Sequence, residues 1–184
     1  QGVGGVYEFP EQYFPRVYNA VRENGGLCTS DEVQTGWGRL GTHFWGFEYA
    51  GVVPDQIVCA KSMGNGFPLA MIAIRREHSE KLRGLTTFNT YGGNPLSLAA
   101  GLATLRVIDD EGMMENSHLR GLEMAAGFRR LQQKHPIISD LRGRGLFQGF
   151  ELVSDRKKKT PLGAAEVMQI QTSLLDQGIV TGKC

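Results

Sequence analysis

The feature that most constrains the fold of this chain is a helical pattern followed by short apolar runs. Residues 10–24 carry apolar side chains at positions i, i+1, i+4, i+5 and i+8, which form one face of an amphipathic helix. Apolar runs of strand length follow at residues 27–30, 56–60 and 69–74. A helix followed by spaced strands predicts an α/β layer structure with functional groups at strand ends.

The second half of the chain continues with helical and strand patterns. We expect helices over residues 95–110, 114–135 and 164–177, one glycine-rich strand over residues 141–152, and a further strand that begins at Ile179. The change of pattern predicts a domain boundary near residues 109–118.

Composition and charge exclude several partners. Twenty basic and 19 acidic side chains give a formal net charge of +1, so nothing in the overall charge favours nucleic acid or an anionic membrane. The one basic cluster, residues 156–159, is interpreted as a solvated loop. No apolar run approaches the roughly 18 residues that span a bilayer. We therefore expect neither nucleic acid nor a membrane as partner.

The cysteines and the two ends of the chain carry weaker information. Cys28, Cys59 and Cys184 are widely spaced, which matches neither a disulfide framework nor C-x-x-C metal spacing. We therefore expect a reducing compartment and no metal site. The sequence begins at Gln1 without an initiator methionine and stops within a strand-like segment, so we expect it to be a fragment of a longer protein.

Three glycines after the first strand have the spacing G-x-G-x-x-G. Gly36, Gly38 and Gly41 could in principle admit a dinucleotide pyrophosphate, but that motif requires a following helix and an acidic residue about 20 positions later. Here an aromatic segment follows, and the next acids, Glu48 and Asp55, come too early. We interpret these glycines as residues that shape a loop.

Asp31 and Lys61 terminate two successive predicted strands. A lysine that leaves an apolar run and enters a glycine-rich turn is partly desolvated, and its amine can attack an aldehyde. An aspartate at a neighbouring strand end could pair with a pyridinium nitrogen. A pyridoxal phosphate enzyme needs this pair of groups. The residues alone leave the alternative open, in which Lys61 is a solvent lysine and Asp31 a loop cap.

Several longer segments resemble one enzyme family. Residues 31–39, 61–68 and 90–95 stand in the order and spacing of the class III aminotransferases, and residues 142–146 are similar as well. The resemblance implies an α/β fold of the type I pyridoxal-phosphate-dependent transferases, with a central, mostly parallel sheet covered by helices on both faces. It also implies that residues 1–112 are the C-terminal half of the cofactor-binding large domain. Residues 113–184 would then be an incomplete small α+β C-terminal domain.

The resemblance also implies roles for single residues. Lys61 would form the Schiff base with pyridoxal 5'-phosphate and move the substrate proton. Asp31 would pair with the pyridine nitrogen, Val33 would pack on one ring face, and Gln34 would approach the phenolic oxygen. Thr90 would reach the cofactor phosphate of a neighbouring subunit, so that two active sites are shared across a homodimer.

Three residues in these segments also have plain structural interpretations. Thr90 could cap the helix that starts near Asn94. Glu32 could be a buried acid satisfied by loop backbone or by an arginine, and we assign it no chemistry. Arg39 is interpreted as a loop or interface arginine rather than as a substrate ligand.

Within the family, residues 43–47 and 88–91 are most similar to the mitochondrial alanine–glyoxylate aminotransferase branch. This predicts transamination from an amino acid such as alanine to a 2-oxo acid such as glyoxylate or pyruvate, in the mitochondrial matrix or the cytoplasm. The alternatives are a phospho-lyase that acts on an amino-alcohol phosphate, and a non-catalytic fragment of such an enzyme. We expect the family's phosphate-binding loop and its carboxylate-binding arginine to lie outside this sequence.

Overall fold

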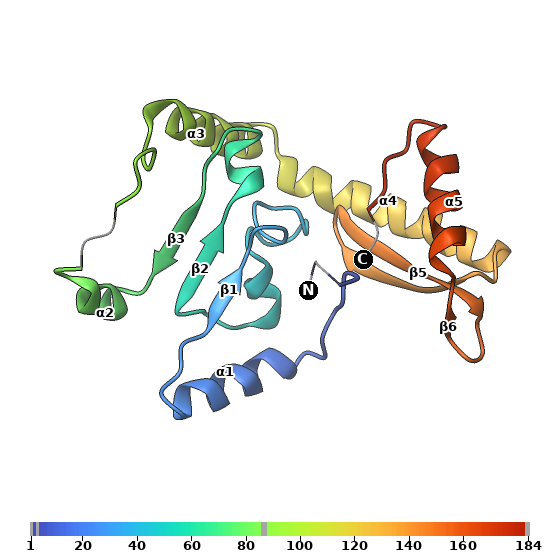
Figure 1. The fold of residues 1–184 in the computed structure, drawn as a ribbon, viewed down its shortest axis with the longest axis horizontal. Coiled ribbons are helices and arrows are strands. Elements are labelled where there is room, and N and C mark those ends of the chain that lie inside the picture. Colours follow the sequence, from blue (N-terminus) through green and yellow to red (C-terminus); the bar gives the residue numbers. More distant parts are fainter. Residues whose placement is uncertain (1, 3, 86–87, 183–184) are drawn as a thin grey trace. The chain divides into compact units, whose positions relative to one another are not determined.

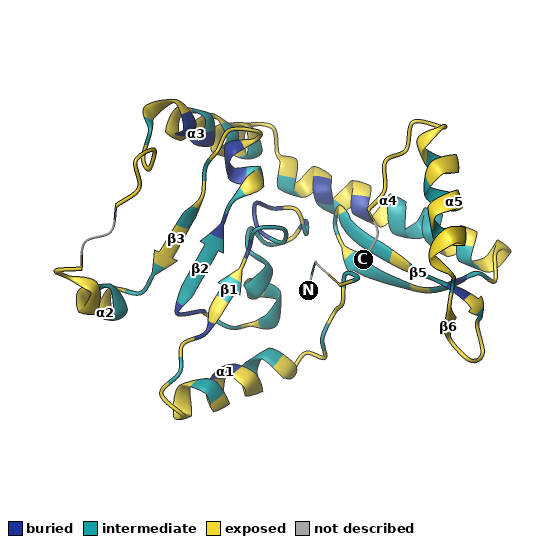
Figure 2. Cartoon of the chain, in the orientation of Figure 1, coloured by how far each residue is buried: buried dark blue, intermediate teal, exposed yellow. Residues whose placement is uncertain are grey.

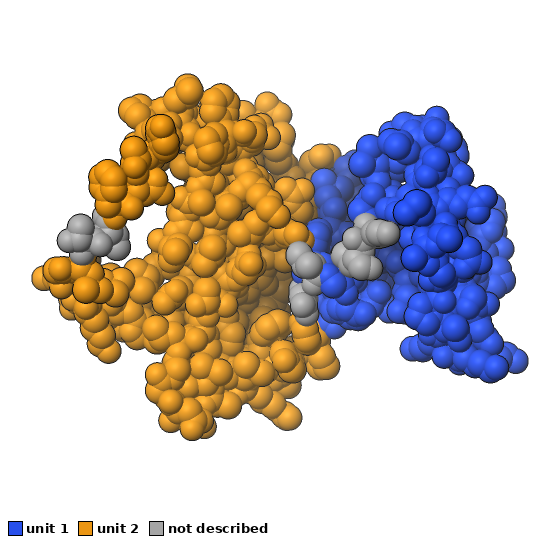
Figure 3. Space-filling view, viewed as in Figure 1, with its two compact units in different colours: residues 1–8, 119–184 blue, residues 9–118 orange. Residues whose placement is uncertain are grey.

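The structure is a computed structural model that describes residue 2 and residues 4–85 and 88–182. The chain forms two compact units (Figure 3): residues 9–118 make one, and residues 1–8 together with 119–184 make the other. The functional division into domains at residues 112 and 113 stays a prediction. Each unit is described separately below.

The unit of residues 9–118 is built around a three-stranded sheet with the order β1-β2-β3 (Figure 1). Strand β1 (Thr29–Asp31) pairs in parallel with β2 (Gln56–Cys59), and β2 pairs antiparallel with β3 (Met71–Ile74). The three strands predicted in this unit are confirmed, each shorter than its apolar run. The sheet is partial and mixed, and the predicted α/β class is confirmed.

The helices predicted over residues 10–24 and 95–110 are confirmed in this unit, whereas its shorter helices were not predicted. The unit contains α1 (Tyr13–Glu23), α2 (Arg76–Ser79) and α3 (Pro95–Asp110), with short 3-10 helices η1 (Gly46–Ala50), η2 (Lys61–Gly64) and η3 (Glu80–Leu82). Helix α3 begins with proline in its first turn, and the Asn94 side chain accepts a hydrogen bond from Ser97 N at 2.9 Å. This cap satisfies one of the amide groups that a helix start leaves without a partner.

The core of this unit is formed by the end of β2 and by the segments that follow β1 and β2. Trp37, Cys59 and Met63 are buried together, and the partly buried hydrophobic residues around them are Phe44, Trp45, Ile57, Leu69, Met71 and Ile108. Figure 2 colours buried stretches of the chain dark blue, among them the end of β2. Met63 belongs to η2 and Cys59 ends β2. The residues that flank Lys61 in sequence are thus anchored in the core.

The other unit contains an antiparallel sheet with the order β4-β5-β6. Its elements are β4 (Ile138–Arg144), β5 (Phe147–Asp155), β6 (Thr160–Pro161) and α5 (Ala164–Leu175), and α4 (Met113–Lys134) contributes its C-terminal part. Phe128 of α4 contacts Phe150 of β5 with ring centroids 5.4 Å apart. This aromatic contact and the Gln148 side chain, which donates to Gly121 O and Gly145 O, hold α4 against the hairpin.

Two strand predictions in this unit are wrong. The single strand expected over residues 141–152 is a β4–β5 hairpin, because Gly145 takes a left-handed φ of 52° and turns the chain. The strand expected at Ile179 is absent from the described residues, which end at 182. A strand needs a hydrogen-bonded neighbour, and none of the described strands pairs with this segment.

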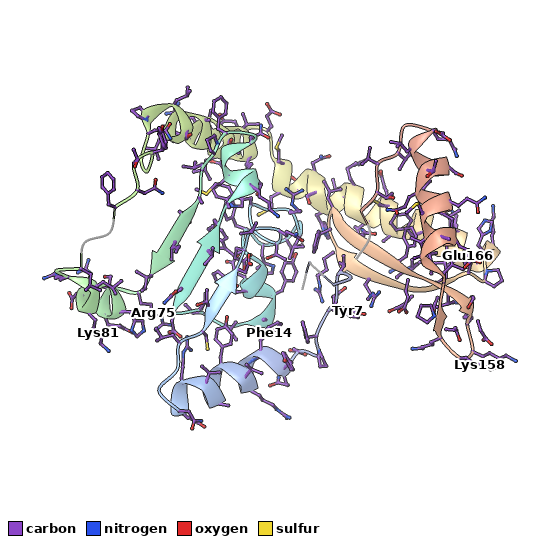
Figure 4. All side chains as sticks on the ribbon, in the orientation of Figure 1. Tyr7, Phe14, Arg75, Lys81, Lys158 and Glu166 are labelled. Carbon is purple, nitrogen blue, oxygen red and sulfur yellow. The ribbon has the colours of Figure 1, made fainter. Side chains whose placement is uncertain are left out.

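The basic cluster at residues 156–159 is exposed and connects β5 with β6, as the solvated-loop interpretation predicted. Asp155 Oδ1 accepts hydrogen bonds from the backbone N–H groups of Lys157 and Lys158, and Lys158 lies at the tip of this connection (Figure 4). Among the described residues, no helix has both the length and the apolar character that crossing a membrane requires.

Candidate active site

The two parallel strands place Asp31 and Lys61 at the same edge of the sheet. Asp31, the last residue of β1, stands opposite Val58 of β2, and Lys61 follows three residues after Val58. Parallel strands end at a common edge, and in α/β proteins ligands bind beyond that edge. The strand positions agree with the expectation from sequence, whereas the chemical roles of both side chains stay predictions.

Lys61 has an unusual backbone conformation. Its φ is +50°, in the left-handed region that non-glycine residues rarely adopt, and it opens η2 one residue after the end of β2. Its side chain is exposed, so the partial desolvation expected from sequence is not provided by the described residues. Among those residues its ammonium group has no hydrogen-bond or ion-pair partner. Backbone strain held in place by a packed surrounding is frequent at functional sites.

Asp31 uses only one of its carboxylate oxygens within the described chain. Its Oδ1 accepts a hydrogen bond from Val33 N at 3.0 Å, which forms a turn directly after β1. Asp31 therefore does cap its own loop, and its second oxygen stays available for another donor. Val33 and Gln34 are half-buried in the turn region of residues 33–40.

Thr90 is exposed in a turn over residues 90–93, ahead of α3. The cap of α3 is the Asn94 side chain, so the structure gives no support to the alternative that Thr90 caps this helix. No described contact joins Thr90 to Asp31 or to Lys61. Its predicted role toward a neighbouring subunit stays a prediction.

The three glycines of the G-x-G-x-x-G stretch are covered by the protein itself. A Cβ atom at Gly36 would lie 3.0 Å from Glu32 O and from the Trp45 ring, and one at Gly41 would lie 2.8 Å from the His118 Cα atom. Gly38 and Gly41 also have φ values of +71° and +100°. These glycines allow a tight loop and close packing, as the sequence interpretation proposed.

The acid next to Asp31 is a buried structural group. Glu32 is 1% exposed and accepts hydrogen bonds from loop backbone and from hydroxyl groups, so the interpretation of a buried acid satisfied by its loop is confirmed. Arg39 is exposed within the same loop, and its carbonyl oxygen accepts a hydrogen bond from Ser117 Oγ at 2.6 Å.

Sequence reasoning missed an ionic cluster around Asp55, which is 4% exposed. Its carboxylate accepts hydrogen bonds from Arg22 Nη2 at 2.9 Å and from Cys28 N at 2.8 Å. Arg75 Nε lies 3.3 Å from Asp55 Oδ1 (Arg75 is labelled in Figure 4). His78 Nε2 lies 4.0 Å from the same oxygen. No short sequence pattern links these partners, which are 20 to 33 residues from Asp55 along the chain.

The environment of Asp55 changes its acidity. Burial alone would raise the pKa of this carboxyl group, but hydrogen bonds from Arg22 and Cys28 N, with the charges of Arg22 and Arg75, lower the pKa below its usual value. The cluster joins α1, the start of β1 and the start of β2, at the edge opposite Asp31 and Lys61.

The described cysteines are buried free thiols, Cys28 and Cys59. Burial raises the pKa of Cys59, and the negative charge of Glu32 raises it further. A thiol of this kind is poorly nucleophilic, because the thiolate is the reactive form. Among the described residues, no group of three or more His, Cys, Asp or Glu side chains could hold a metal ion.

The sequence matches known proteins along its whole length. It is 43% identical to human mitochondrial alanine–glyoxylate aminotransferase 2 over all of this chain and 36% of that protein. It is 46% identical to the Arabidopsis thaliana mitochondrial alanine–glyoxylate aminotransferase 2 homolog 2, of which it covers 38%. The ethanolamine-phosphate phospho-lyase homolog 1 of Caenorhabditis elegans is 41% identical over 94% of this chain and 38% of its own length.

Solved structures agree with these relatives. An aminotransferase from Bacillus anthracis superposes with a TM-score of 0.91 at 32% identity, over 98% of this chain and 42% of that one. A phospholyase from Arthrobacter, solved in complex with phosphoethanolamine, gives 0.91 at 33% identity, over 97% of this chain and 42% of that one. The present chain thus spans less than half the length of the proteins that it matches.

The family model of the class III aminotransferases matches residues 1–184, which is the full sequence. The sequence identities and the shared fold given above agree with this match. The chain belongs to the class III aminotransferases.

Proposed function

We propose that the polypeptide carrying this sequence is a pyridoxal 5'-phosphate-dependent aminotransferase. It transfers an amino group from an amino acid such as alanine to a 2-oxo acid such as glyoxylate or pyruvate. One observation carries the proposal: the β1–β2 register brings the Asp31 carboxylate to the same sheet edge as Lys61, whose amine has no partner among the described residues. Family membership and the alanine–glyoxylate aminotransferase relatives support the same reaction.

The donor set at this edge fits the proposed cofactor. Lys61 would hold the cofactor through its primary amine, which can attack an aldehyde carbon, and the same amine would move the substrate proton. Asp31 keeps one oxygen for a protonated pyridine nitrogen. Val33 supplies an apolar surface for the ring, and Gln34 supplies an amide for the phenolic oxygen. When bound, pyridoxal phosphate supplies the electron sink for the carbanion of the substrate.

The Lys61 assignment is tested by chemical labelling. Borohydride reduction of the cofactor-loaded, full-length polypeptide, followed by peptide mapping, should place a pyridoxyl group on Lys61. The Lys61→Ala variant should lose transamination by several orders of magnitude, because the covalent and the proton-transfer roles disappear together. A pyridoxyl group on a different lysine would contradict the assignment.

The Asp31 assignment needs a kinetic test. Asp31→Asn should still allow the covalent bond between Lys61 and the cofactor, because the amine is untouched. Abstraction of the substrate proton should become much slower, because the ring nitrogen loses the anion that keeps it protonated. A near-normal rate with saturated cofactor would show that Asp31 acts only as a cap for its loop.

We further propose a homodimer in which Thr90 serves the cofactor phosphate of the partner subunit. Thr90 is exposed and its hydroxyl has no partner among the described residues, which leaves it available to a second chain. Mixing two inactive variants tests this: Lys61→Ala in one and a bulky replacement of Thr90 in the other. If the residues serve opposite subunits, each mixed dimer has one intact site and regains activity toward half of normal. Mixed dimers without activity would reject the shared site.

Two further assignments rest on the same relatives. We propose that residues 1–112 belong to the cofactor-binding large domain and residues 113–184 to the smaller domain. A mitochondrial location is proposed from the relatives whose names include it. Microscopy of the full-length polypeptide fused to a fluorescent protein would test the location, and a signal outside mitochondria would contradict it.

A phospho-lyase is the second candidate, because two of the similar proteins are phospho-lyases. The two reactions give different products from different substrates. Incubation with alanine and glyoxylate should yield pyruvate, whereas incubation with phosphoethanolamine would release inorganic phosphate in the case of a phospho-lyase. The ratio of the two values of kcat/KM decides between the candidates.

A further inference from the structure

Glu32 is among the most deeply buried side chains of the described chain, although it follows directly after the exposed Asp31. Four donors surround its carboxylate. Oε1 accepts from Ser30 Oγ and Phe47 N, both at 2.9 Å, and Oε2 accepts from Thr35 Oγ1 at 2.8 Å and Gly46 N at 2.7 Å. An ionised carboxylate only accepts hydrogen bonds, and with about four lone-pair directions this one is saturated.

The four donors come from two separate stretches of chain. Ser30 and Thr35 lie on either side of Glu32, whereas Gly46 and Phe47 open η1. The backbone of Glu32 is fixed as well, because its N–H donates to Val58 O of β2 at 2.9 Å. Glu32 therefore joins the end of β1, the neighbouring strand β2 and the start of η1 in one contact region.

The packing around this carboxylate leaves little freedom for adjustment. A Cβ atom at Gly46 would lie 2.7 Å from Thr35 Oγ1 and 3.1 Å from Glu32 Oε2. Contacts below 3.0 Å do not occur for real Cβ atoms, so only glycine fits at position 46 without a shift of the loop. The loop that follows β1 is thus held against η1 by hydrogen bonds and by close contact.

We propose that Glu32 is a positioning residue for the cofactor-contacting side chains Asp31, Val33 and Gln34. It lies between them in sequence, and its side chain and its own backbone N–H are both tied to other segments. The 1% exposed carboxylate has no accessible lone pair, so it does not touch the substrate or the cofactor. The inference rests on the proposed function, because it assigns those three residues to the cofactor.

The geometry also explains why a carboxylate is needed rather than an amide. Oε1 faces Phe47 N and Oε2 faces Gly46 N, and neither backbone N–H can rotate away. In Glu32→Gln, one of the two oxygens becomes an NH2 group. In either orientation of the amide, this NH2 group meets a backbone donor. The variant therefore breaks the hydrogen bond between one side of the carboxylate and the backbone at nearly constant volume, and leaves a buried N–H without an acceptor.

The test compares the full-length polypeptide with two variants, Glu32→Gln and the matched control Glu48→Gln. Glu48 is exposed in the same η1 helix, and its Oε2 accepts a hydrogen bond from Trp45 N at 2.8 Å. In the control, the amide oxygen of the new glutamine can still accept this hydrogen bond. Apo protein is titrated with pyridoxal 5'-phosphate, and the visible absorbance band of the bound cofactor is then followed against pH.

Glu32→Gln should weaken cofactor binding by about tenfold, from the loss of one hydrogen bond to a charged group. It should also move the pH midpoint of the absorbance band upward, which means that the bound cofactor keeps its titrating proton to a higher pH. A displaced Gln34 no longer stabilises negative charge on the phenolic oxygen, and a displaced Asp31 no longer supports the protonated ring. Glu48→Gln should leave both quantities at wild-type values. A change of the pH midpoint separates positioning from a role in stability alone.

Thr35→Val is the second variant if Glu32→Gln does not fold, because it removes one hydroxyl donor and keeps the other three. It should weaken cofactor binding by a factor of about three and shift the same midpoint in the same direction. Wild-type protein that binds no cofactor overturns both the proposed function and this inference. Wild-type binding together with unchanged affinity and pH midpoint in the folded variant overturns this inference alone.

Discussion

The replacement Asp55→Asn gives a direct test of how the sheet is held together. The Asp55 carboxylate is 4% exposed and faces Arg22 and Arg75, so the variant leaves two guanidinium groups without their shared anion. Removal of one partner of a buried ion pair costs about 3–5 kcal/mol. The side chains of Arg22 and Arg75 are 36% and 38% exposed, so water partly replaces the lost contacts. We therefore expect a loss of about 2–3 kcal/mol in the free energy of unfolding.

Denaturant unfolding of the full-length polypeptide measures this loss, with Glu77→Gln as the matched control. Glu77 contacts the same Arg75 at 3.8 Å and the same His78 at 3.9 Å, but its side chain is 68% exposed. The control should change the free energy of unfolding by less than about 0.5 kcal/mol. If Asp55→Asn costs no more than Glu77→Gln, the ionic cluster does not stabilise the fold.

The pH dependence provides a second check on the same residue. The pKa of Asp55 is lower in the folded protein than in the unfolded chain, where an aspartate has a pKa of about 3.9. Its stabilisation is therefore complete above that unfolded value, and it is lost as the pH falls through the lower folded value. The difference between wild type and Asp55→Asn should shrink in this acidic range. A constant difference down to the lowest pH would contradict the lowered pKa.

Two further substitutions test local packing and capping. Gly121→Ala in α4 gains helix propensity, yet its Cβ would collide with the backbone of Gly145, so we expect a net loss of about 1–2 kcal/mol. Gly127→Ala in the same helix meets only the flexible end of an arginine at 3.8 Å and should be neutral or stabilising by up to about 1 kcal/mol. Thermal unfolding of both variants measures the difference, and equal effects would refute the predicted collision at Gly145. Asn94→Ala removes the side-chain cap of α3 and should cost about 1 kcal/mol, whereas Asn94→Asp should keep most of the stability in the same measurement.

Patterns carried by neighbouring residues could be predicted from the sequence. The apolar periodicity of residues 10–24 gave α1, and Asn94 followed by Pro95 marked the start of α3. The ends of β1 and β2 were predicted from apolar runs that stop at Asp31 and Lys61. Each of these signals lies within one element, where local conformation and burial depend on a few adjacent side chains.

Features that depend on distant residues could not be predicted in the same way. The turn at Gly145 divides the glycine-rich stretch of residues 141–152, which was expected to be one strand, because glycine accepts a left-handed φ that the pattern itself does not reveal. The partners of Asp55 come from α1 and from the residue after β3, and no local spacing connects them. Thr90 shows the same limit, because its proposed partner lies in a second chain.

The two buried carboxylates have complementary positions on the β1–β2 pair. Asp55 precedes β2 and binds Cys28 N, directly before β1, while the Glu32 N–H after β1 donates to Val58 O of β2. Both strands are short, with three and four residues, so their own ladder holds the register weakly. A slip of β1 by one residue would turn each of its side chains to the other face of the sheet, so the Asp31 carboxylate would no longer be placed for its proposed role. The polar contacts at the two ends of the strands therefore set the register on which the proposed chemistry depends.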